Sequence, residues 1–139
     1  MRRALLLIAA LIAFTFTTSL ARADNAKSAV RAVVEAQVAA LAAGDAEEAF
    51  SYATPDIQKR FGSAENFLAM VRLSYSALIK AEVFEVEAVE AQGEHGAVRA
   101  HVVGKDGKAF KAIYPLLRQP DGTWLIDGCY LQTTDGQSL

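Results

Sequence analysis

Residues 97–119 read AVRAHVVGKDGKAFKAIYPLLRQ, and apolar side chains alternate with other residues on both sides of the KDGK turn. Alternation with a period of two is typical of a β-strand with one buried face. An Asp-Gly pair between two such runs is a strong hairpin signal. The segment therefore predicts an antiparallel hairpin with strands at Ala97–Val103 and Ala109–Gln119. Pro115 cannot donate a ladder hydrogen bond, so it marks a bulge or an edge in the second of these strands.

The same alternation begins before this hairpin and continues after it. Between residues 82 and 90 apolar residues alternate with glutamates, and residues 93–96 form a turn. A further turn, Pro120-Asp121-Gly122, leads to an expected strand at Thr123–Thr133. The chain from residue 82 onward therefore predicts a four-stranded antiparallel meander.

The residues before the meander carry the 3.6-residue period and the start signals of helices. A first helix is expected to run from a cap at Asp24 or Asn25 to Gly44, a residue that suits a left-handed C-terminal cap. Three further helix starts are expected at Asp45 with Glu48, at Thr54 before Pro55, and at Ser63. Helices followed by a meander predict an α+β fold with the N-terminal helices packed on one face of the sheet.

Residues 1–23 have the three parts of a secretory signal peptide: two N-terminal arginines, an apolar run at residues 4–14, and the cleavage pattern Ala21-Arg22-Ala23. Ser19-Leu20-Ala21 is an alternative cleavage pattern. The other interpretation is a membrane anchor, but the apolar run is shorter than the roughly 20 residues that cross a bilayer. We expect cleavage, export to the periplasm or the medium, no stable membrane anchor, and one mature domain at residues 24–139.

The composition narrows the class of protein. The chain has 139 residues, 53% of them hydrophobic, and a formal net charge of −2. Residues 24–139 hold 11 of the 14 basic residues and all 16 acidic ones, a net charge of −5. These values exclude disordered, collagen-like, coiled-coil and disulfide-scaffold proteins, and they weigh against nucleic acid as a partner. Cys129 is the only cysteine, and its apolar strand favours a buried, inert thiol.

Three motifs together resemble a known bacterial family. They are Phe61-Gly62-Ser63, Phe67-Leu68-Ala69-Met70-Val71, and Arg118-Gln119-Pro120-Asp121-Gly122-Thr123-Trp124. The chain resembles the domain of unknown function 4864 family across its mature part, and its order of elements is similar to the nuclear-transport-factor-2-like superfamily. That resemblance implies a cone-shaped fold, with a pocket between the helices and a curved sheet. The superfamily includes isomerases, dehydratases, binding domains and assembly modules, so the resemblance implies no function and supplies no catalytic residues.

Residues two apart along a strand share one face of a sheet. By apolar content, we expect the helix-facing side to hold Phe84, Val86, Ala88, Val98, Ala100, Val102, Phe110, Ala112, Tyr114, Leu116, Trp124, Ile126, Gly128 and Tyr130. We expect the opposite face to hold Glu85, Glu87, Arg99, His101, Lys111, Ile113, Leu125, Asp127 and Cys129. The acid–base candidates His101 and Asp127 are therefore expected to face away from the helices, in a surface ion pair or hydrogen bond.

Aromatic rings with polar tips are expected around an apolar cleft between helices and sheet. The candidate ligand-binding residues are Tyr52, Met70, Tyr75, Tyr114, Trp124 and Tyr130. The alternative is that these rings simply fill the core.

Two functions remain open from the sequence. One is a non-enzymatic domain that binds a small apolar or aromatic molecule or acts as an interaction module. The other is an isomerase-, dehydratase- or hydrolase-like enzyme that uses Tyr114 or Tyr130. With no carboxylate or histidine expected on the concave face, binding is favoured. No metal-ligand spacing and no Gly-rich phosphate loop occurs, so we expect no metal and no cofactor.

The outer face of the sheet is expected to combine charged residues with Val103, Ile113, Leu125, Cys129 and Leu131. Such a face is more apolar than one that contacts only water, so it predicts a homodimer through this surface. The alternatives are a cover formed by the C-terminal tail, or ordinary exposure of apolar residues.

Overall fold

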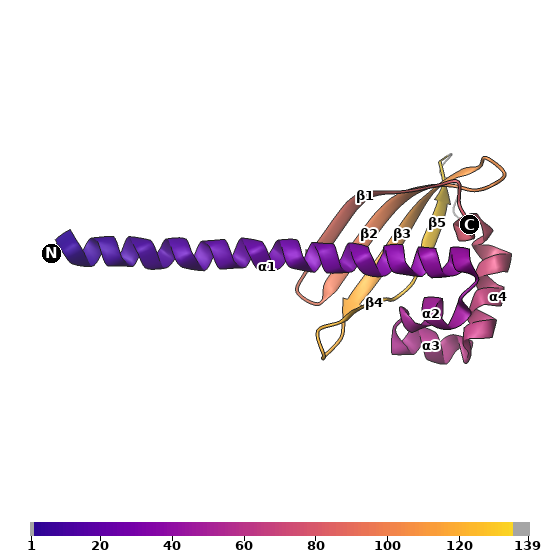
Figure 1. Cartoon of the computed structure of the whole chain (residues 1–139), viewed down its shortest axis with the longest axis horizontal. Helices are drawn as coiled ribbons and strands as arrows, with labels where there is room; N and C mark the ends of the chain where they lie inside the picture. The colour runs from indigo at the N-terminus through magenta and orange to yellow at the C-terminus, as the bar shows by residue number, and fades with distance from the viewer. Residues whose placement is uncertain (1, 135–139) are drawn as a thin grey trace.

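The computed structural model describes residues 2–134, and side chains from Leu20 onward. A long helix crosses one face of a curved antiparallel sheet, and three shorter helices gather beside its C-terminal end (Figure 1). The elements are α1 (Arg2–Ala43), α2 (Ala46–Ser51), α3 (Pro55–Phe61), α4 (Ala64–Ser74), a 3₁₀ turn η1 (Ser76–Leu78), β1 (Val83–Gln92), β2 (His95–Val103), β3 (Ala109–Arg118), β4 (Trp124–Ile126) and β5 (Tyr130–Thr133). This order confirms the predicted α+β fold.

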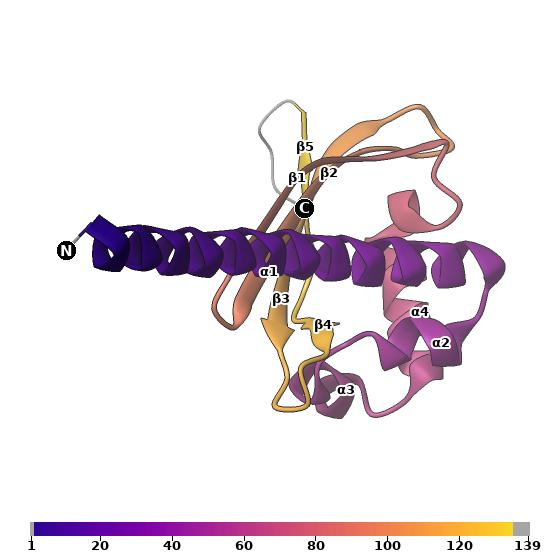
Figure 2. The same cartoon turned by 60° about the vertical axis from the view of Figure 1, so that its left-hand side comes forward.

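The sheet is built around β3, which corresponds to the strand predicted at Ala109–Gln119. The strand order is β1-β2-β3-β4, and β5 also pairs with β3, on the edge that β4 uses. All of these pairings are antiparallel, and Figure 2 shows α1 lying across them. The helices and the sheet therefore form two layers with the main core between them.

Local sequence signals place the short helices. Side-chain oxygens of the predicted cap residues accept hydrogen bonds from backbone N–H groups: Asp45 from Glu48 at 3.1 Å, Thr54 from Ile57 at 3.5 Å, and Ser63 from Asn66 at 3.2 Å. Gly44 and Gly62 follow α1 and α3 with positive φ angles of 73° and 78°, as left-handed caps do. The three predicted caps and the end of the first helix are confirmed.

The predicted start of the first helix at Asp24 or Asn25 is wrong. Helix α1 is continuous from Arg2 and passes through both residues without a break. No glycine or proline occurs between Arg2 and Ala43, so a favourable cap residue in the interior does not interrupt the helix. The N-terminal part of α1 extends beyond the sheet (Figure 1).

The core begins where α1 meets the sheet. Val30 and Val34 of α1 are 0% exposed and pack against the buried residues of β2 and β3. Gly96 lets α1 approach β2 closely, because a Cβ there would lie 2.9 Å from a methyl group of Val30. A second cluster joins α1, α2 and α4, and its buried residues are Ala40, Leu41, Ala49, Phe67, Leu68 and Val71.

Because β1 contains a bulge, the predicted position of Ala88 on the helix-facing side is wrong. Val86 pairs with Ala100, but Ala88 pairs with Arg99, so Glu87 is an extra residue on β1. Beyond it, Val89 pairs with buried Val98 and packs against the core. Ala88, predicted to face the helices, is therefore displaced from that face.

The predicted single strand at Thr123–Thr133 is wrong, because it breaks into β4 and β5. Ile126 pairs with Leu116 and Tyr130 pairs with Ile113, so three residues at 127–129 lie opposite two on β3. The extra residue reverses the faces beyond it: Leu131 is 2% exposed in the core, and Tyr130 is 62% exposed. Leu131 had been expected on the outer face of the sheet, and Tyr130 on the helix-facing side.

The outer face keeps part of its predicted apolar content. His101 pairs with Glu85 and Lys111 on the side away from α1, as expected. Val103, Ile113 and Leu125 are half-buried, but Leu131 and Cys129 pack toward the core instead. The homodimer through this face stays a prediction.

Candidate functional site

A cavity of about 210 Å³ lies between the short helices and the break in the sheet edge. Its walls come from the C-terminal half of α1, from α3 and α4, and from the residues that join β4 to β5. The lining residues are Gln37, Leu41, Ala53, Ile57, Arg60, Phe61, Phe67, Met70, Val71, Tyr75, Leu78, Tyr114, Ile126, Asp127, Gly128, Cys129 and Tyr130.

The helical wall is apolar and aromatic. Phe67, Met70 and Val71 lie three and four residues apart on α4, so they share one face of that helix. The Phe67 ring contacts the ring of Phe61 edge-on at 5.7 Å and lies 5.5 Å from the ring of Phe50. These contacts hold the wall in place without any charged group.

Tyr114 of β3 supplies a buried hydroxyl at the sheet wall of the cavity. The residue is 0% exposed, and its ring meets Phe84 edge-on at 6.3 Å. Its hydroxyl has no hydrogen-bond partner of ordinary geometry among the described residues. The Cys129 thiol lies beside it, but a thiol is a weak hydrogen-bonding group and leaves the hydroxyl largely unsatisfied.

The groups around Tyr114 are neutral. Burial, and then the neighbouring Cys129, raises the pKa of Tyr114 well above its usual value. Burial raises the pKa of the Cys129 thiol to about 12 against a smaller opposing effect of Tyr114. Burial, together with Cys129 and Tyr130, also raises the pKa of Tyr75. All three groups therefore stay protonated at neutral pH, and Cys129 is a poor nucleophile.

Asp127 lies on the cavity wall, so the expectation that it faces away from the helices is wrong. Its carboxylate accepts a hydrogen bond from the Thr54 hydroxyl at 2.8 Å. The segment before α3 runs beside β4, where Thr54 N donates to Ile126 O at 2.9 Å and Ile126 N donates to Tyr52 O at 2.8 Å. This pairing and the break after β4 bring the carboxylate next to the start of α3.

Sequence reasoning also missed Gln37. It is buried, and its side-chain amide donates to the Ala49 carbonyl at 3.1 Å, joining α1 to α2. The signal available was a polar residue on the apolar stripe that Val34 and Leu41 define. Arg60, also missed, is exposed at the rim of the cavity.

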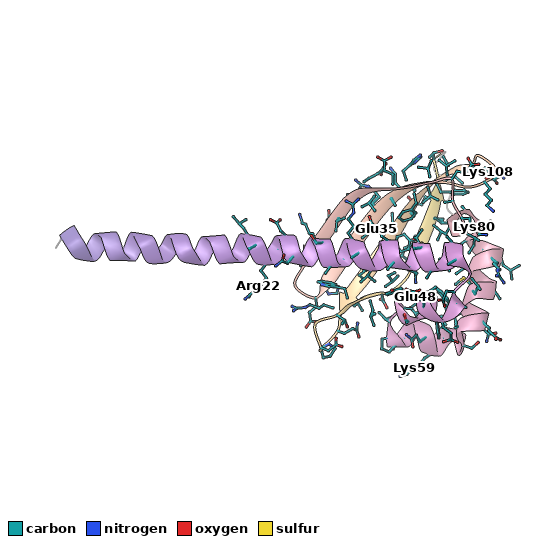
Figure 3. All side chains as sticks on the ribbon, in the orientation of Figure 1. Arg22, Glu35, Glu48, Lys59, Lys80 and Lys108 are labelled. Atoms are coloured by element: carbon teal, nitrogen blue, oxygen red, sulfur yellow. The ribbon has the colours of Figure 1, made fainter. Side chains whose placement is uncertain are left out.

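The structure brings four of the six candidate ligand-binding residues to this cavity: Met70, Tyr75, Tyr114 and Tyr130. Tyr52 lies elsewhere, and its hydroxyl donates to Glu48 at 3.1 Å, a residue labelled on α2 in Figure 3. That bond, followed by burial, raises the pKa of Tyr52. Trp124 is buried in the core with Val30.

Within residues 2–134, no three His, Cys, Asp or Glu side chains gather in a way that could hold a metal ion. Nor does any described helix combine the length and apolar character needed to cross a membrane.

Comparisons with known proteins support the fold and the family. A family model described as domain of unknown function (DUF4864) matches residues 23–139, which confirms the resemblance in the motifs. The structure is similar to a crystal structure of an NTF-2-like protein of unknown function from Burkholderia xenovorans LB400, with a TM-score of 0.51 and 17% identity over 76% of this chain and 84% of that chain. At this identity the similarity concerns the fold alone. A search of curated proteins found no match.

The two hydrogen bonds of Thr54 generate a stability prediction. Thr54→Val keeps the volume but removes both the cap of α3 and the bond to Asp127, so it should lower the free energy of unfolding by about 2 kcal/mol or more. Thr54→Ser keeps the hydroxyl and should lose less than half of that. Urea denaturation of the three proteins provides the measurement. Equal stability of wild type and Thr54→Val would show that the hydroxyl contributes nothing.

Proposed function

This chain belongs to the domain of unknown function 4864 (DUF4864) family, and we propose that its mature form is an exported domain that binds a small apolar or aromatic molecule in the cavity beside Tyr114. The cavity carries this proposal. Its lining is mostly apolar and aromatic, with a few polar groups that converge on it, and this combination is typical of small-ligand sites.

The size of the cavity limits the ligand. Its volume is about 210 Å³, whereas an engineered cavity of about 150 Å³ in another protein binds benzene. A molecule with one ring and a small substituent, or a short branched chain, therefore fits.

The alternative is an isomerase-, dehydratase- or hydrolase-like enzyme, and one observation favours it. Asp127 supplies the cavity carboxylate that the sequence had not placed there. The raised pKa of Tyr114 weighs against the tyrosine as a base at neutral pH, which leaves Asp127 as the only candidate base among these groups. We retain binding as the function that the site supports best, because one carboxylate does not define a reaction.

Export is proposed from the N-terminal sequence and from the surroundings of the predicted cut. Residues 21–25 are exposed, and Arg22 lies on α1 close to the edge of the sheet (Figure 3). The family match begins at residue 23, next to the predicted start of the mature chain. Cleavage after Ala23 would leave in place the helix residues that pack against the core, the first of which is Ala26.

A homodimer through the outer sheet face is proposed on revised residues. Leu117 pairs with Leu125 and Ile113 with Tyr130, which gives an apolar strip along β3 and its edge. Beside it, β1 carries Glu85 and β3 carries Lys111. A second copy related by a two-fold axis would place Glu85 of each copy opposite Lys111 of the other.

Binding should be detectable with two single-ring probes, ethylbenzene and acetophenone, by amide chemical shifts of the labelled protein. Shifts should cluster at Met70, Tyr75 and Cys129. Met70→Trp fills the cavity and should weaken binding at least about tenfold. Leu73→Trp is the matched control on α4, where Leu73 is 86% exposed, and should change nothing. Absence of shifts at saturating concentrations of both probes would refute the ligand-binding proposal.

Export predicts a defined mature N-terminus. The full sequence expressed in a bacterial host should yield periplasmic or secreted protein that begins at Asp24, with Arg22 as the alternative start. Edman sequencing or intact mass provides the measurement. Protein recovered only from the cytoplasm with residues 1–23 attached would contradict the proposal.

The dimer predicts a mass of two chains in light scattering after size exclusion. Ile113→Glu places a charge in the apolar strip and should give monomers, whereas Leu73→Glu removes an exposed apolar residue elsewhere and should not. A monomer mass at every concentration of the wild type would rule the dimer out.

A further inference from the structure

The Tyr114 hydroxyl needs a stronger hydrogen-bond acceptor than the described residues supply, since its partner there is the weak Cys129 thiol. Tyr114 is 0% exposed and lines the cavity, and its hydroxyl has no partner of ordinary geometry within the described residues. A buried donor without an acceptor is costly, so such groups are rare unless something outside the chain completes them. A bound molecule with an acceptor atom at this depth would complete this one.

The surroundings of that hydroxyl do not suit a negative charge. Its neighbour Cys129 is neutral, as is Tyr75 in the same lining, and the one cationic side chain among the described lining residues, Arg60, is exposed. Transfer of a carboxylate from water to such a place is unfavourable without a paired cation.

The two charged residues of the lining, Asp127 and Arg60, also disfavour a negatively charged ligand. Asp127 is an anion on the wall, and one of its oxygens already accepts from Thr54. Among the lining residues that the structure describes, Arg60 is the only cation, and it is exposed on the last turn of α3, at the rim. A carboxylate placed deep in the cavity would lack a counterion and would be repelled by Asp127.

We infer that the ligand is an electrically neutral molecule with an apolar body and a hydrogen-bond acceptor, such as a ketone, aldehyde or ester carbonyl, which accepts from Tyr114 while the body lies against Phe67 and Met70. This inference rests on the proposed ligand-binding function. It adds the chemical class of the ligand, its orientation, and the exclusion of carboxylates of equal size.

Three probes of similar size separate the effect of an acceptor atom on binding from the effect of a charge. Acetophenone has a carbonyl, ethylbenzene has no acceptor, and benzoate is charged. Calorimetric titration of the full-length protein at pH 7 should give a Kd for acetophenone about fivefold or more below that for ethylbenzene. The Kd for benzoate should be at least about tenfold above that for acetophenone.

Two matched variants assign the preference to one hydroxyl. Tyr114→Phe keeps the ring, and it should abolish the preference for acetophenone while leaving the Kd of ethylbenzene unchanged within about twofold. Tyr52→Phe removes a tyrosine hydroxyl that lies outside the cavity, bonded to Glu48, and should keep the preference. Thermal unfolding checks the fold of both, and loss of an unpartnered hydroxyl is not expected to lower the stability of Tyr114→Phe.

The outcomes distinguish this inference from the function on which it rests. Failure of all three probes to bind would overturn both. Binding of ethylbenzene as tight as that of acetophenone would overturn only the neutral-acceptor inference. Binding of benzoate as tight as that of acetophenone would do the same, whether or not Arg60 binds the benzoate. A preference that survives in Tyr114→Phe would also overturn it.

Discussion

The missing N–H group of Pro115 is the constraint on which the sheet edge and the cavity both depend. The Pro115 carbonyl accepts from Asp127 N at 2.8 Å, so its backbone faces the edge strand. In an antiparallel strand the N–H and C=O of one residue point to the same side, so the donor that proline lacks belongs to this edge. The ladder breaks there, and the edge strand takes one extra residue. On the side of β2, where Pro115 lies opposite Ala97, the register continues without interruption.

That single extra residue links the sheet edge to the proposed site. It directs Cys129 toward Tyr114 and Leu131 into the core, and it leaves Asp127 beside Thr54. The cavity consequently has a neutral, buried hydrogen-bonding end formed by the sheet and an apolar wall formed by α4. A carboxylate stands at one side, held by the residue that caps α3. This arrangement is the basis of the proposed selection of ligands by charge as well as by shape.

The features that could be predicted from the sequence are those in which local interactions dominate. A cap such as Ser63 bonds to a backbone group three residues away, so its effect is visible in the sequence itself. Tyr114 was placed on the helix-facing side correctly, because β3 keeps its alternation throughout. By contrast, parity counted along the fourth strand failed after Ile126, since the count assumed an unbroken ladder. Gln37 escaped notice because its partner, Ala49, belongs to another helix.

The amino-acid order alone established an α+β fold, the helix caps, the hairpin around Asp106-Gly107 and the family. Each of these depends on periodicity, on turn chemistry or on motifs within a short stretch of chain. Only the tertiary structure decided the position of the Asp127 carboxylate. Pro115 indicated a bulge or an edge from the sequence alone. Which neighbouring strand would carry the extra residue depended on the side to which the backbone of Pro115 points. The same holds for the unsatisfied Tyr114 hydroxyl, because whether a buried group has a partner depends on all the elements packed around it.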